Sequence, residues 1–322
     1  MNLIDLATSS WGPFLARTMC KVLPRQWTYR IGDQLSAIAS RQDQLPFVQA
    51  LRTNMAVVLG LPEDHTEVSQ AVQHSFQNYV RGHIDLCRAV ESGPNEVYAS
   101  CEFDPSLMEV IEAHRSSGRG LIIVGAHTCS FDIMMLALMK HFESVQVLTK
   151  SNPEGSSVKM NEIRTTFGID ITPISMEALR DAVHRLRNGG VVAIAADVPL
   201  ENGDMLSFFG KRTKLPAGHA RLALKTGAMI VVGTSYKSCD GSYYAVGEHV
   251  HQPPVTGDKN LDAAQWTQES LNIIERYIQE RPEEWFMPVA LWPQTAIPES
   301  QDQDRNYDLG VQNLAVDHPR GQ

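Results

Sequence analysis

The sequence predicts an α/β fold, in which a central, mainly parallel β-sheet is flanked by helices and preceded by a helical N-terminal region. Apolar runs of four or five residues, such as 121–124 and 191–195, are typical of strands buried on both faces of a sheet. Segments with apolar residues at three- and four-residue spacing separate these runs, as the crossover helices of a parallel sheet do. The chain before Gly118 shows helical spacing alone, so we expect the sheet to begin after it.

Three regions follow from this pattern. We expect residues 1–117 to form a helical region packed on the core, residues 118–293 to form the α/β core, and residues 294–322 to form a mobile tail with few apolar residues and no periodicity. Helical spacing is clearest at Val48, Leu51, Met55 and Val58, and again at Val72, Phe76, Val80 and Ile84. Breaks are expected at Pro24, at residues 60–62 and at residues 93–94.

Within the core, strands and helices alternate. We expect strands at residues 121–124, 145–148, 169–173, 191–195, 229–235 and 243–250. We expect helices from about Ser130 and at residues 158–167, 176–186 and 261–280. The Asn-Gly-Gly sequence at 188–190 is a helix C-cap signal that supports the boundary between the third helix and the strand at 191–195.

Charge and cysteine content exclude some functions. The net charge of -9 argues against a general nucleic-acid binder, because such proteins neutralise phosphates with clustered Lys and Arg. The five cysteines are scattered and form no C-x-x-C pair, so neither a disulfide framework nor a zinc site is indicated, and a reducing cytosolic setting fits best. His249 and His251 lie on one face of a strand, but no third metal ligand is near in sequence, so structural roles are favoured.

The N-terminus suggests contact with a membrane surface. No run approaches the roughly 20 apolar residues that span a bilayer. Residues 3–23 nevertheless alternate apolar residues with Arg17 and Lys21, as an interfacial helix would. A helix packed on its own domain would give the same pattern, so both interpretations stay open. The segment lacks the features of a secretory signal peptide.

A possible base lies where the first core strand turns into a helix. His127 follows that strand, and Asp132 comes five residues later, among the first residues of the helix. Imidazole accepts protons near neutral pH and becomes a better base when a carboxylate holds its other nitrogen. We expect the turn to bring Asp132 back beside His127, at the strand end where α/β sheets place their sites. In the structural alternative, Asp132 only stabilises the start of the helix, His127 only fills the turn, and neither residue takes part in chemistry.

Four further features strengthen the functional interpretation. Asp197 ends a second buried strand as His127 follows a first. Lys211, Arg212, Lys214, Arg221 and Lys225 fall in a segment without Asp or Glu, which suits phosphate groups, although a solvated loop is the alternative. Arg164 lies on a helix between the two strands, where we expect it to reach the same cleft as His127, although a single helical arginine is usually a surface residue. Trp285 and Trp292 close the ordered chain with aromatic side chains that either cap the fold or contact lipid. Cys129 is a minor candidate nucleophile that more often fills space as a small buried residue.

These motifs, in this order along the chain, resemble those of the bacterial glycolipid acyltransferases. These comprise the lipid A lauroyl/myristoyl transferases and the phosphatidylinositol mannoside acyltransferase, within the wider lysophospholipid acyltransferase superfamily. The H-x-x-x-x-D/E motif matches residues 127–132, the D-x-x block matches Asp197, and the F-F-G...G...L-A...T-G-A block runs from Phe208, Phe209 and Gly210 to Ala228. The resemblance extends from about Gln26 to Trp292. The terminal W-x-M...W form is more similar to the mannoside acyltransferase than to the lipid A enzymes.

The resemblance implies a mechanism. His127 would deprotonate a hydroxyl of a glycolipid or phospholipid, and Asp132 would orient His127 and stabilise its charge. The hydroxyl oxygen would then attack the thioester of acyl-CoA or acyl carrier protein. The resemblance implies no covalent enzyme intermediate, cofactor or metal. Backbone N–H groups of the turn or Arg164 would stabilise the oxyanion. Asp197 would position acceptor hydroxyls or the histidine. The implied substrate-binding residues are Arg164, Phe208, Phe209, Gly210, Lys211, Arg212, Lys214 and Arg221.

The resemblance also implies peripheral attachment to the cytoplasmic face of the bacterial inner membrane. Two other classes stay open: an acyl-thioester hydrolase that uses the same base, and a non-enzymatic protein that binds lipid or acyl carrier. The acceptor, the acyl chain length, the donor and the oligomeric state are left open by the sequence.

Overall fold

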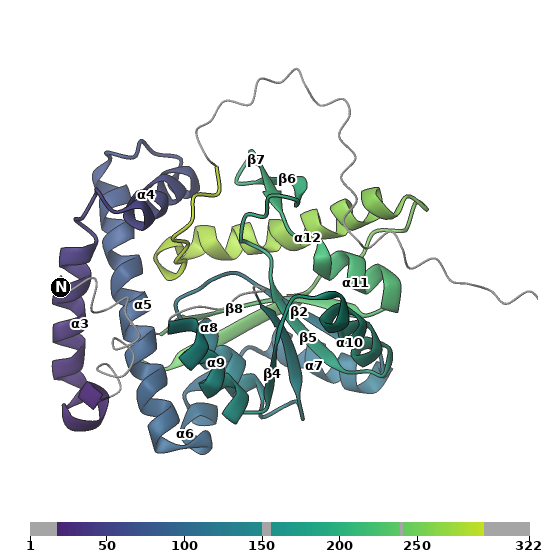
Figure 1. Ribbon diagram of the computed structural model, residues 1–322, viewed down its shortest axis with the longest axis horizontal. Coiled ribbons are helices and arrows are strands. Elements are labelled where there is room, and N and C mark those ends of the chain that lie inside the picture. Colours follow the sequence, from purple (N-terminus) through teal and green to yellow (C-terminus); the bar gives the residue numbers. More distant parts are fainter. Residues whose placement is uncertain (1–17, 150–155, 239–240, 293–322) are drawn as a thin grey trace, which may run out of the picture. The chain divides into compact units, whose positions relative to one another are not determined.

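A seven-stranded sheet forms the centre of the fold, as the computed structural model shows for residues 18–149, 156–238 and 241–292 (Figure 1). Its strand order is β1-β9-β8-β2-β5-β3-β4. The strands are β1 (Cys101–Phe103), β2 (Leu121–Gly125), β3 (Val145–Thr149), β4 (Ile169–Pro173), β5 (Val191–Ala195), β8 (Met229–Lys237) and β9 (Tyr243–His249). Neighbouring strands are parallel except for β8 and β9. The predicted α/β class with a mainly parallel sheet is confirmed.

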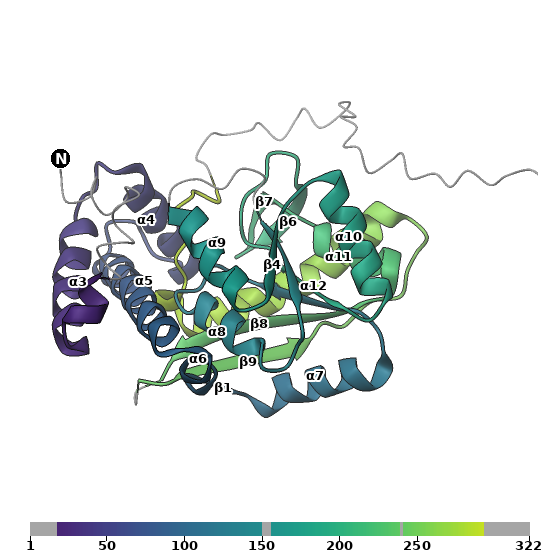
Figure 2. The same cartoon turned by 60° about the horizontal axis from the view of Figure 1, so that its bottom comes forward.

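Helices cover both faces of this sheet. α7 (Pro105–Ser117) and α8 (Phe131–Leu138) share a buried apolar cluster with Leu121 and Ile123 of β2. α10 (Met176–Arg187), α11 (Gly218–Thr226) and α12 (Lys259–Glu280) share another with Ile122 and Val124. Alternate residues of β2 therefore point to opposite helical layers, which explains its unbroken apolar run. Figure 2 shows α7 beneath the sheet and α10 to α12 on its other side, while α9 (Ser156–Thr166) contacts β4.

The register of β2 fixes the position of two polar residues. β2 lies between β5 and β8, and Gly125 pairs with Ala195 at the carboxyl ends of β2 and β5. The Ala196 N–H donates to the Gly125 carbonyl at 3.0 Å, which extends this pairing by one residue. His127 and Asp197 each lie two residues beyond their strand, so the parallel register brings them to the same edge of the sheet.

Helices make up most of the described chain before β2. They are α3 (Arg25–Ala39), α4 (Pro46–Leu59), α5 (Thr66–Ser92), α6 (Pro94–Ala99) and α7. α5 passes close to the turn after β2, where a Cβ atom added to Gly82 would lie 2.4 Å from the Cys129 carbonyl oxygen. No helix among the described residues combines the length and the apolar composition needed to cross a bilayer. Most of the N-terminal segment predicted to be interfacial, and the predicted tail, lie outside the described residues.

Some elements were not predicted. β1 is only three residues long and gives no alternation to detect. The basic segment, expected only as a binding region, forms a hairpin of β6 (Asp204–Phe208) and β7 (Lys211–Leu215) followed by α11. Its two-residue turn has φ of 52° at Phe209 and 69° at Gly210. Such turns usually carry Asn-Gly or Asp-Gly, so Phe-Gly gave no hairpin signal.

The chain after α12 returns to the sheet edge and is held there by the N-terminal helices. We call residues 282–291 the C-terminal strip; it starts with the short helix η1 (Pro282–Glu284). Ser75 Oγ donates to the Trp285 carbonyl at 2.7 Å. The buried Asn54 amide donates to the Met287 and Val289 carbonyls at 2.9 and 2.8 Å and accepts from the Leu291 N–H at 3.1 Å.

We expect Asn54→Ala to lower the free energy of unfolding by about 2–3 kcal/mol, because it leaves buried backbone groups of the strip without partners. Urea unfolding at pH 7 measures this. Asn272→Ala, at an exposed position of α12, is the control and should change it by less than about 0.5 kcal/mol. Equal effects of the two substitutions would contradict the role given to Asn54.

Candidate active site

The carboxylate of Asp197 is the centre of the site. Its side chain is fully buried, with 0% exposure, just beyond β5. Asp197 Oδ1 accepts from His127 Nδ1 at 2.7 Å, and Oδ2 accepts from the His127 backbone N–H at 2.8 Å. The indole Nε1 of Trp285 donates to the same Oδ2 at 2.9 Å. Three donors therefore compensate for the loss of hydration of this buried charge.

This arrangement assigns the tautomer of His127. An ionised carboxylate only accepts hydrogen bonds, so the neutral imidazole carries its hydrogen on Nδ1 and its lone pair on Nε2. The His127 side chain is 49% exposed, and Nε2 has no hydrogen-bond partner among the described residues. The site thus presents an accessible nitrogen that can accept a proton from a ligand.

The electrostatics of the pair favour this state. Loss of hydration acts to lower the pKa of His127, but the charge and hydrogen bond of Asp197 act against it, and the net pKa lies above the usual value of about 6.5. Burial acts to raise the pKa of Asp197, but the contacts with His127 and Trp285 outweigh it, so that pKa is lowered. Asp197 therefore stays ionised at neutral pH and stabilises a protonated His127.

The C-terminal strip holds the turn that carries His127. The Cys129 N–H donates to the Glu284 carbonyl at 2.7 Å, and the Phe286 N–H donates to the His127 carbonyl at 2.9 Å. Thr128 and Trp285 form an antiparallel bridge between these bonds. The strip therefore pairs with the turn as a short strand would, and this pairing brings the Trp285 indole to Asp197.

Asp132 does not hold the histidine ring, contrary to the expectation from its spacing. It lies in the first turn of α8, where its Oδ1 accepts from Arg164 Nε at 2.7 Å. The parallel pairing of β2 with β5 places Asp197, not Asp132, at Nδ1. The charge of Asp132 also raises the pKa of His127, although burial, which lowers this pKa, and Asp197, which raises it, have larger effects.

Arg164 was expected to reach the cleft, and its ion pair places it beside Asp132. Its side chain is mostly buried, and a second nitrogen, Nη1, donates to Asn161 Oδ1 at 2.8 Å. The remaining Nη2 has no hydrogen-bond partner among the described residues. Arg164 is thus held at two points and keeps one donor group for another acceptor.

Phe208, Phe209 and Gly210 lie behind the site and at the hairpin turn. Phe208 is fully buried, with its ring centroid 6.4 Å from that of Trp285 and 6.0 Å from that of Trp292. The Phe209 N–H donates to Glu275 Oε1 at 2.7 Å, and Gly210 is exposed at the turn. The two aromatic rings therefore pack against the tryptophan that contacts Asp197.

The basic residues fall into two groups. Lys211, Arg212 and Lys214 are exposed on β7 and have no ion pair among the described residues. Arg221 binds both carboxylate oxygens of Asp204, at 2.7 and 2.9 Å. The charge of Arg221 is thus compensated within the protein, and the hairpin carries the free positive charge.

Cys129 is not placed as a nucleophile. Its side chain is buried, and burial is the main cause of a pKa well above the usual thiol value. Its Sγ lies 3.6 Å from the Ser75 carbonyl, to which the thiol donates. Among the described residues, no group of three or more His, Cys, Asp and Glu side chains is arranged to hold a metal ion.

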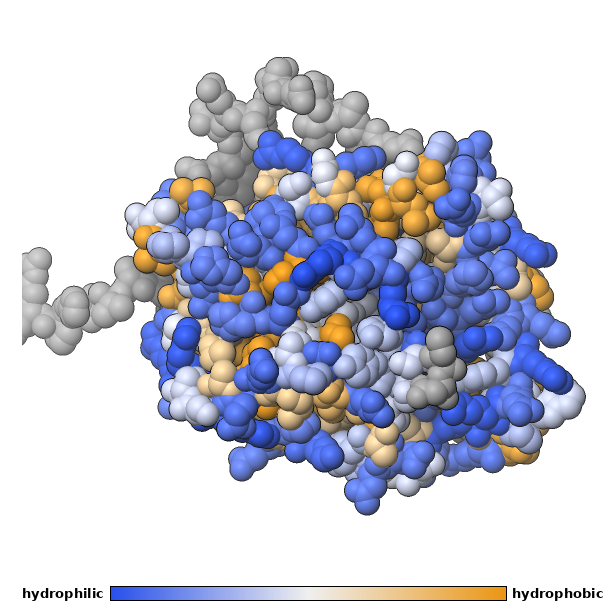
Figure 3. All heavy atoms as spheres, turned by 180° about the vertical axis from the view of Figure 1, so that it is seen from behind, coloured by the Kyte–Doolittle hydropathy of each residue, from blue (hydrophilic) through white to orange (hydrophobic). Residues whose placement is uncertain are grey.

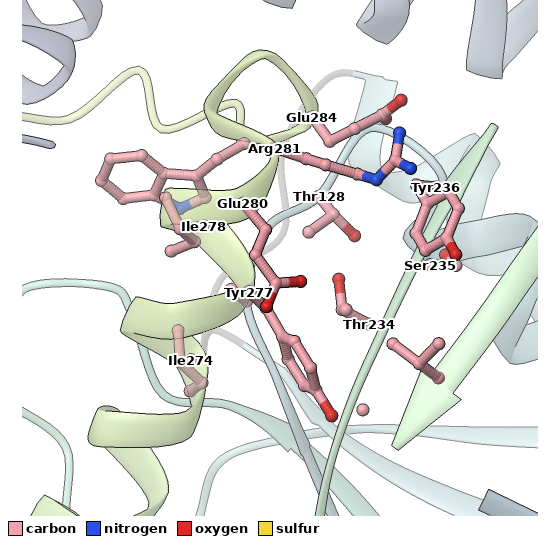
Figure 4. A pocket seen from close by; sticks show the side chains of 14 residues that line it. Thr128, Thr234, Ser235, Tyr236, Ile274, Tyr277, Ile278, Glu280, Arg281 and Glu284 are labelled. Atoms are coloured by element: carbon pink, nitrogen blue, oxygen red, sulfur yellow. The ribbon is translucent and has the colours of Figure 1, made fainter. Parts of the chain in front are cut away.

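A small cavity lies beside the turn, between β8, α12 and the C-terminal strip (Figure 4). The hydroxyls of Thr128 and Thr234 and the Glu280 carboxylate point toward it. Its volume of about 30 Å³ is the size of one or two water molecules, too small for a lipid or a nucleotide. This cavity is therefore not a candidate for the substrate site.

Trp285 is the residue that sequence reasoning missed. The sequence marked it only as one of several aromatic residues near the end of the core. Its function depends on a hydrogen bond to a residue 88 positions earlier, and no local pattern encodes such a contact.

Comparisons with known proteins place the chain near bacterial lipid acyltransferases. The sequence model of the family described as bacterial lipid A biosynthesis acyltransferase matches residues 6–293. The phosphatidylinositol mannoside acyltransferase of Mycobacterium tuberculosis (strain CDC 1551) is 24% identical over 249 residues, which cover 76% of this chain and 77% of the relative. The enzyme of the same name from Mycolicibacterium smegmatis is 25% identical over 257 residues, with 76% and 79% covered.

We expect the pKa of His127, followed by NMR of its ring protons, to lie above about 6.5 in the unaltered chain. Asp197→Asn should lower it, because the carboxylate charge that raises it is then lost. Asp132→Asn is the control and should lower it less, because Arg164 offsets the charge of Asp132. Equal decreases in the two variants would contradict the pairing of His127 with Asp197.

Trp285→Phe should cost about 1.5–3 kcal/mol more unfolding free energy at pH 7 than Trp292→Phe. Both substitutions remove a similar apolar volume, but Trp285 donates to a buried carboxylate, whereas the buried Trp292 Nε1 has no hydrogen-bond partner within the described part of the chain. Urea unfolding of the two variants isolates the hydrogen bond. Equal losses would mean that the indole N–H contributes nothing at Asp197.

Proposed function

This chain belongs to the bacterial lipid A biosynthesis acyltransferase family, and from that premise we propose that it transfers a fatty acyl group from an acyl thioester to a hydroxyl of a glycolipid or phospholipid at the membrane surface. The observation that carries the proposal is the His127–Asp197 pair, with Nε2 accessible at the carboxyl edge of the sheet. An accessible neutral imidazole held by a buried carboxylate is suited to remove a proton from a hydroxyl.

In the proposed reaction, Nε2 of His127 takes the acceptor hydroxyl proton while the hydroxyl oxygen attacks the thioester carbonyl carbon. The C–O bond forms, and the carbonyl oxygen becomes an oxyanion. The C–S bond then breaks, and the leaving thiolate takes the proton from the imidazolium. Asp197 stabilises the imidazolium between the two steps, and the reaction requires no covalent enzyme intermediate or cofactor.

Arg164 is the proposed donor to the oxyanion, together with backbone N–H groups of the turn. Two of its nitrogens are fixed by Asp132 and Asn161, which leaves Nη2 in a defined position. A held guanidinium needs little reorganisation when charge develops on a substrate oxygen. In this proposal Asp132 acts through Arg164 and through its charge near His127.

Lys211, Arg212 and Lys214 of the hairpin are the proposed contacts for the acyl donor. Acyl-CoA carries phosphates and acyl carrier proteins carry acidic surfaces, and both would be attracted to these exposed cations. The similarity to phosphatidylinositol mannoside acyltransferases supports a sugar-bearing phospholipid as the acceptor. A lipid A-like acceptor is the alternative. We place the reaction at the cytoplasmic face of the bacterial inner membrane, with the protein bound peripherally.

We expect His127→Ala to lower the rate of acyl transfer by about 10²–10⁴-fold, because the base is lost. Mass spectrometry of lipids after incubation with acyl-CoA or acyl carrier protein and candidate glycolipids measures the product. His251→Ala, an exposed histidine outside the site, is the control and should keep the full rate.

Full activity of the His127→Ala variant would contradict the assignment of the base. Release of free fatty acid without acylated lipid would instead favour a hydrolase that uses the same dyad on water. His127 is exposed enough for water to reach it, so the assay must quantify both products.

A further inference from the structure

The helix α3 carries large apolar side chains on its exposed side. Trp27, Leu35 and Ile38 are 56%, 39% and 55% exposed. With Ile31 between them, they recur at intervals of three to four residues and form one row along the helix. We call Trp27, Ile31, Leu35 and Ile38 the α3 row. Val22, just before the helix, is 74% exposed.

The side of α3 that packs on α5 is built from small residues instead. Thr28, Gly32 and Ser36 are its buried residues. A Cβ atom added to Gly32 would lie 2.8 Å from Val80 Cγ1 on α5, so the two helices approach closely there. A helix of a water-soluble protein normally buries its large apolar residues, and α3 leaves them outside.

The charges around the α3 row are mainly positive. The guanidinium of Arg30 lies 5.3 Å from the ring centroid of Trp27, and Arg41 follows the end of the helix. Neither arginine has an ion pair among the described residues. Asp33, the acidic residue of α3, is occupied by Arg81 at 2.6 and 2.8 Å. The free local charge is therefore positive, although the whole chain carries -9.

The position of α3 leaves this side unobstructed by the described core. α3 lies at the outer edge of the fold, with α5 between it and the sheet, in both ribbon views (Figures 1 and 2). The face of the molecule in Figure 3 is mostly hydrophilic, with several apolar patches among the hydrophilic side chains. A row of exposed apolar side chains along one helix requires its own explanation.

We infer that α3 lies on an anionic lipid bilayer, with the α3 row inserted among the lipid head groups. Tryptophan favours the membrane interface, and arginines beside an apolar row pair with anionic head groups while their stems remain in the apolar layer. The inference rests on the proposed function, because the acceptor would be presented in that bilayer. It assigns the membrane contact to a named surface.

The same contact would position the active site. α5 packs against α3 through Val80, and its Gly82 lies against the Cys129 carbonyl in the turn that carries His127. With helix spacings of about 8–10 Å, the turn lies roughly two helix layers from the α3 row. A bound α3 therefore holds His127 at a set distance from the lipid surface.

The test is co-sedimentation of the full chain with vesicles of phosphatidylcholine alone or with phosphatidylglycerol added. We expect Trp27→Gln combined with Ile38→Gln to weaken binding to the anionic vesicles by roughly tenfold or more. Arg30→Glu with Arg41→Glu should weaken it to a similar extent and leave binding to neutral vesicles unchanged. Val255→Gln with Leu261→Gln, at sites 63% and 47% exposed outside α3, is the matched control.

Unchanged binding of the α3 variants, an equal loss in the control, or no binding of the unaltered chain would overturn the inference. An assay of acyl transfer to an acceptor in detergent micelles tests the proposed function independently of membrane binding by α3. A chain that binds vesicles through α3 but transfers no acyl group would retain the inference and refute the function. Transfer with binding independent of α3 would do the reverse. Because the substituted side chains are exposed, circular dichroism should show unchanged folding.

Discussion

A buried carboxylate must find donors for its oxygens, and this requirement at Asp197 organises the site. The carboxylate has no exposed surface, so its charge depends for stabilisation on the donors that reach it, which are the ring and backbone of His127 and the indole of Trp285. These donors come from the turn after β2 and from the C-terminal strip. The pairing of β2 with β5 and the docking of the strip therefore both contribute to the environment of this carboxylate.

Much of the fold was predictable because two features are visible in short stretches of sequence. These are the apolar runs of strands buried on both faces and the three- and four-residue spacing of helices. The strands near β2, β5 and β8 and the helix at α12 lie close to where the sequence placed them. His127 and Asp197 were also found, since polar residues directly after buried strands are conspicuous. Their partnership was only one of two roles that the resemblance implied for Asp197, because it depends on β2 and β5 being neighbours, which is a property of strand order. Asp132 was preferred as the partner because spacing along the chain was the only distance available.

The N-terminal helices also have contacts that could not be predicted from local sequence patterns. In the sequence these segments showed only helical spacing of apolar residues. In the fold Asn54 and Ser75 hold the backbone of the C-terminal strip, and Asn78 donates to the Glu283 carbonyl at 3.2 Å. These side chains support residues more than 200 positions away, so periodicity alone identifies them only as helix positions. The N-terminal helices therefore support the C-terminal strip, which pairs with the turn that carries His127.

The docking of the C-terminal strip has a consequence for biosynthesis. A ribosome delivers the chain from its N-terminus, and domains begin to fold as they emerge. The strands that precede His127 and Asp197 leave the ribosome before Trp285, which lies 88 positions after Asp197. A nascent chain that ends before the C-terminal strip can thus form part of the sheet while its central carboxylate still lacks a donor. The site is therefore completed only after translation has passed the C-terminal strip.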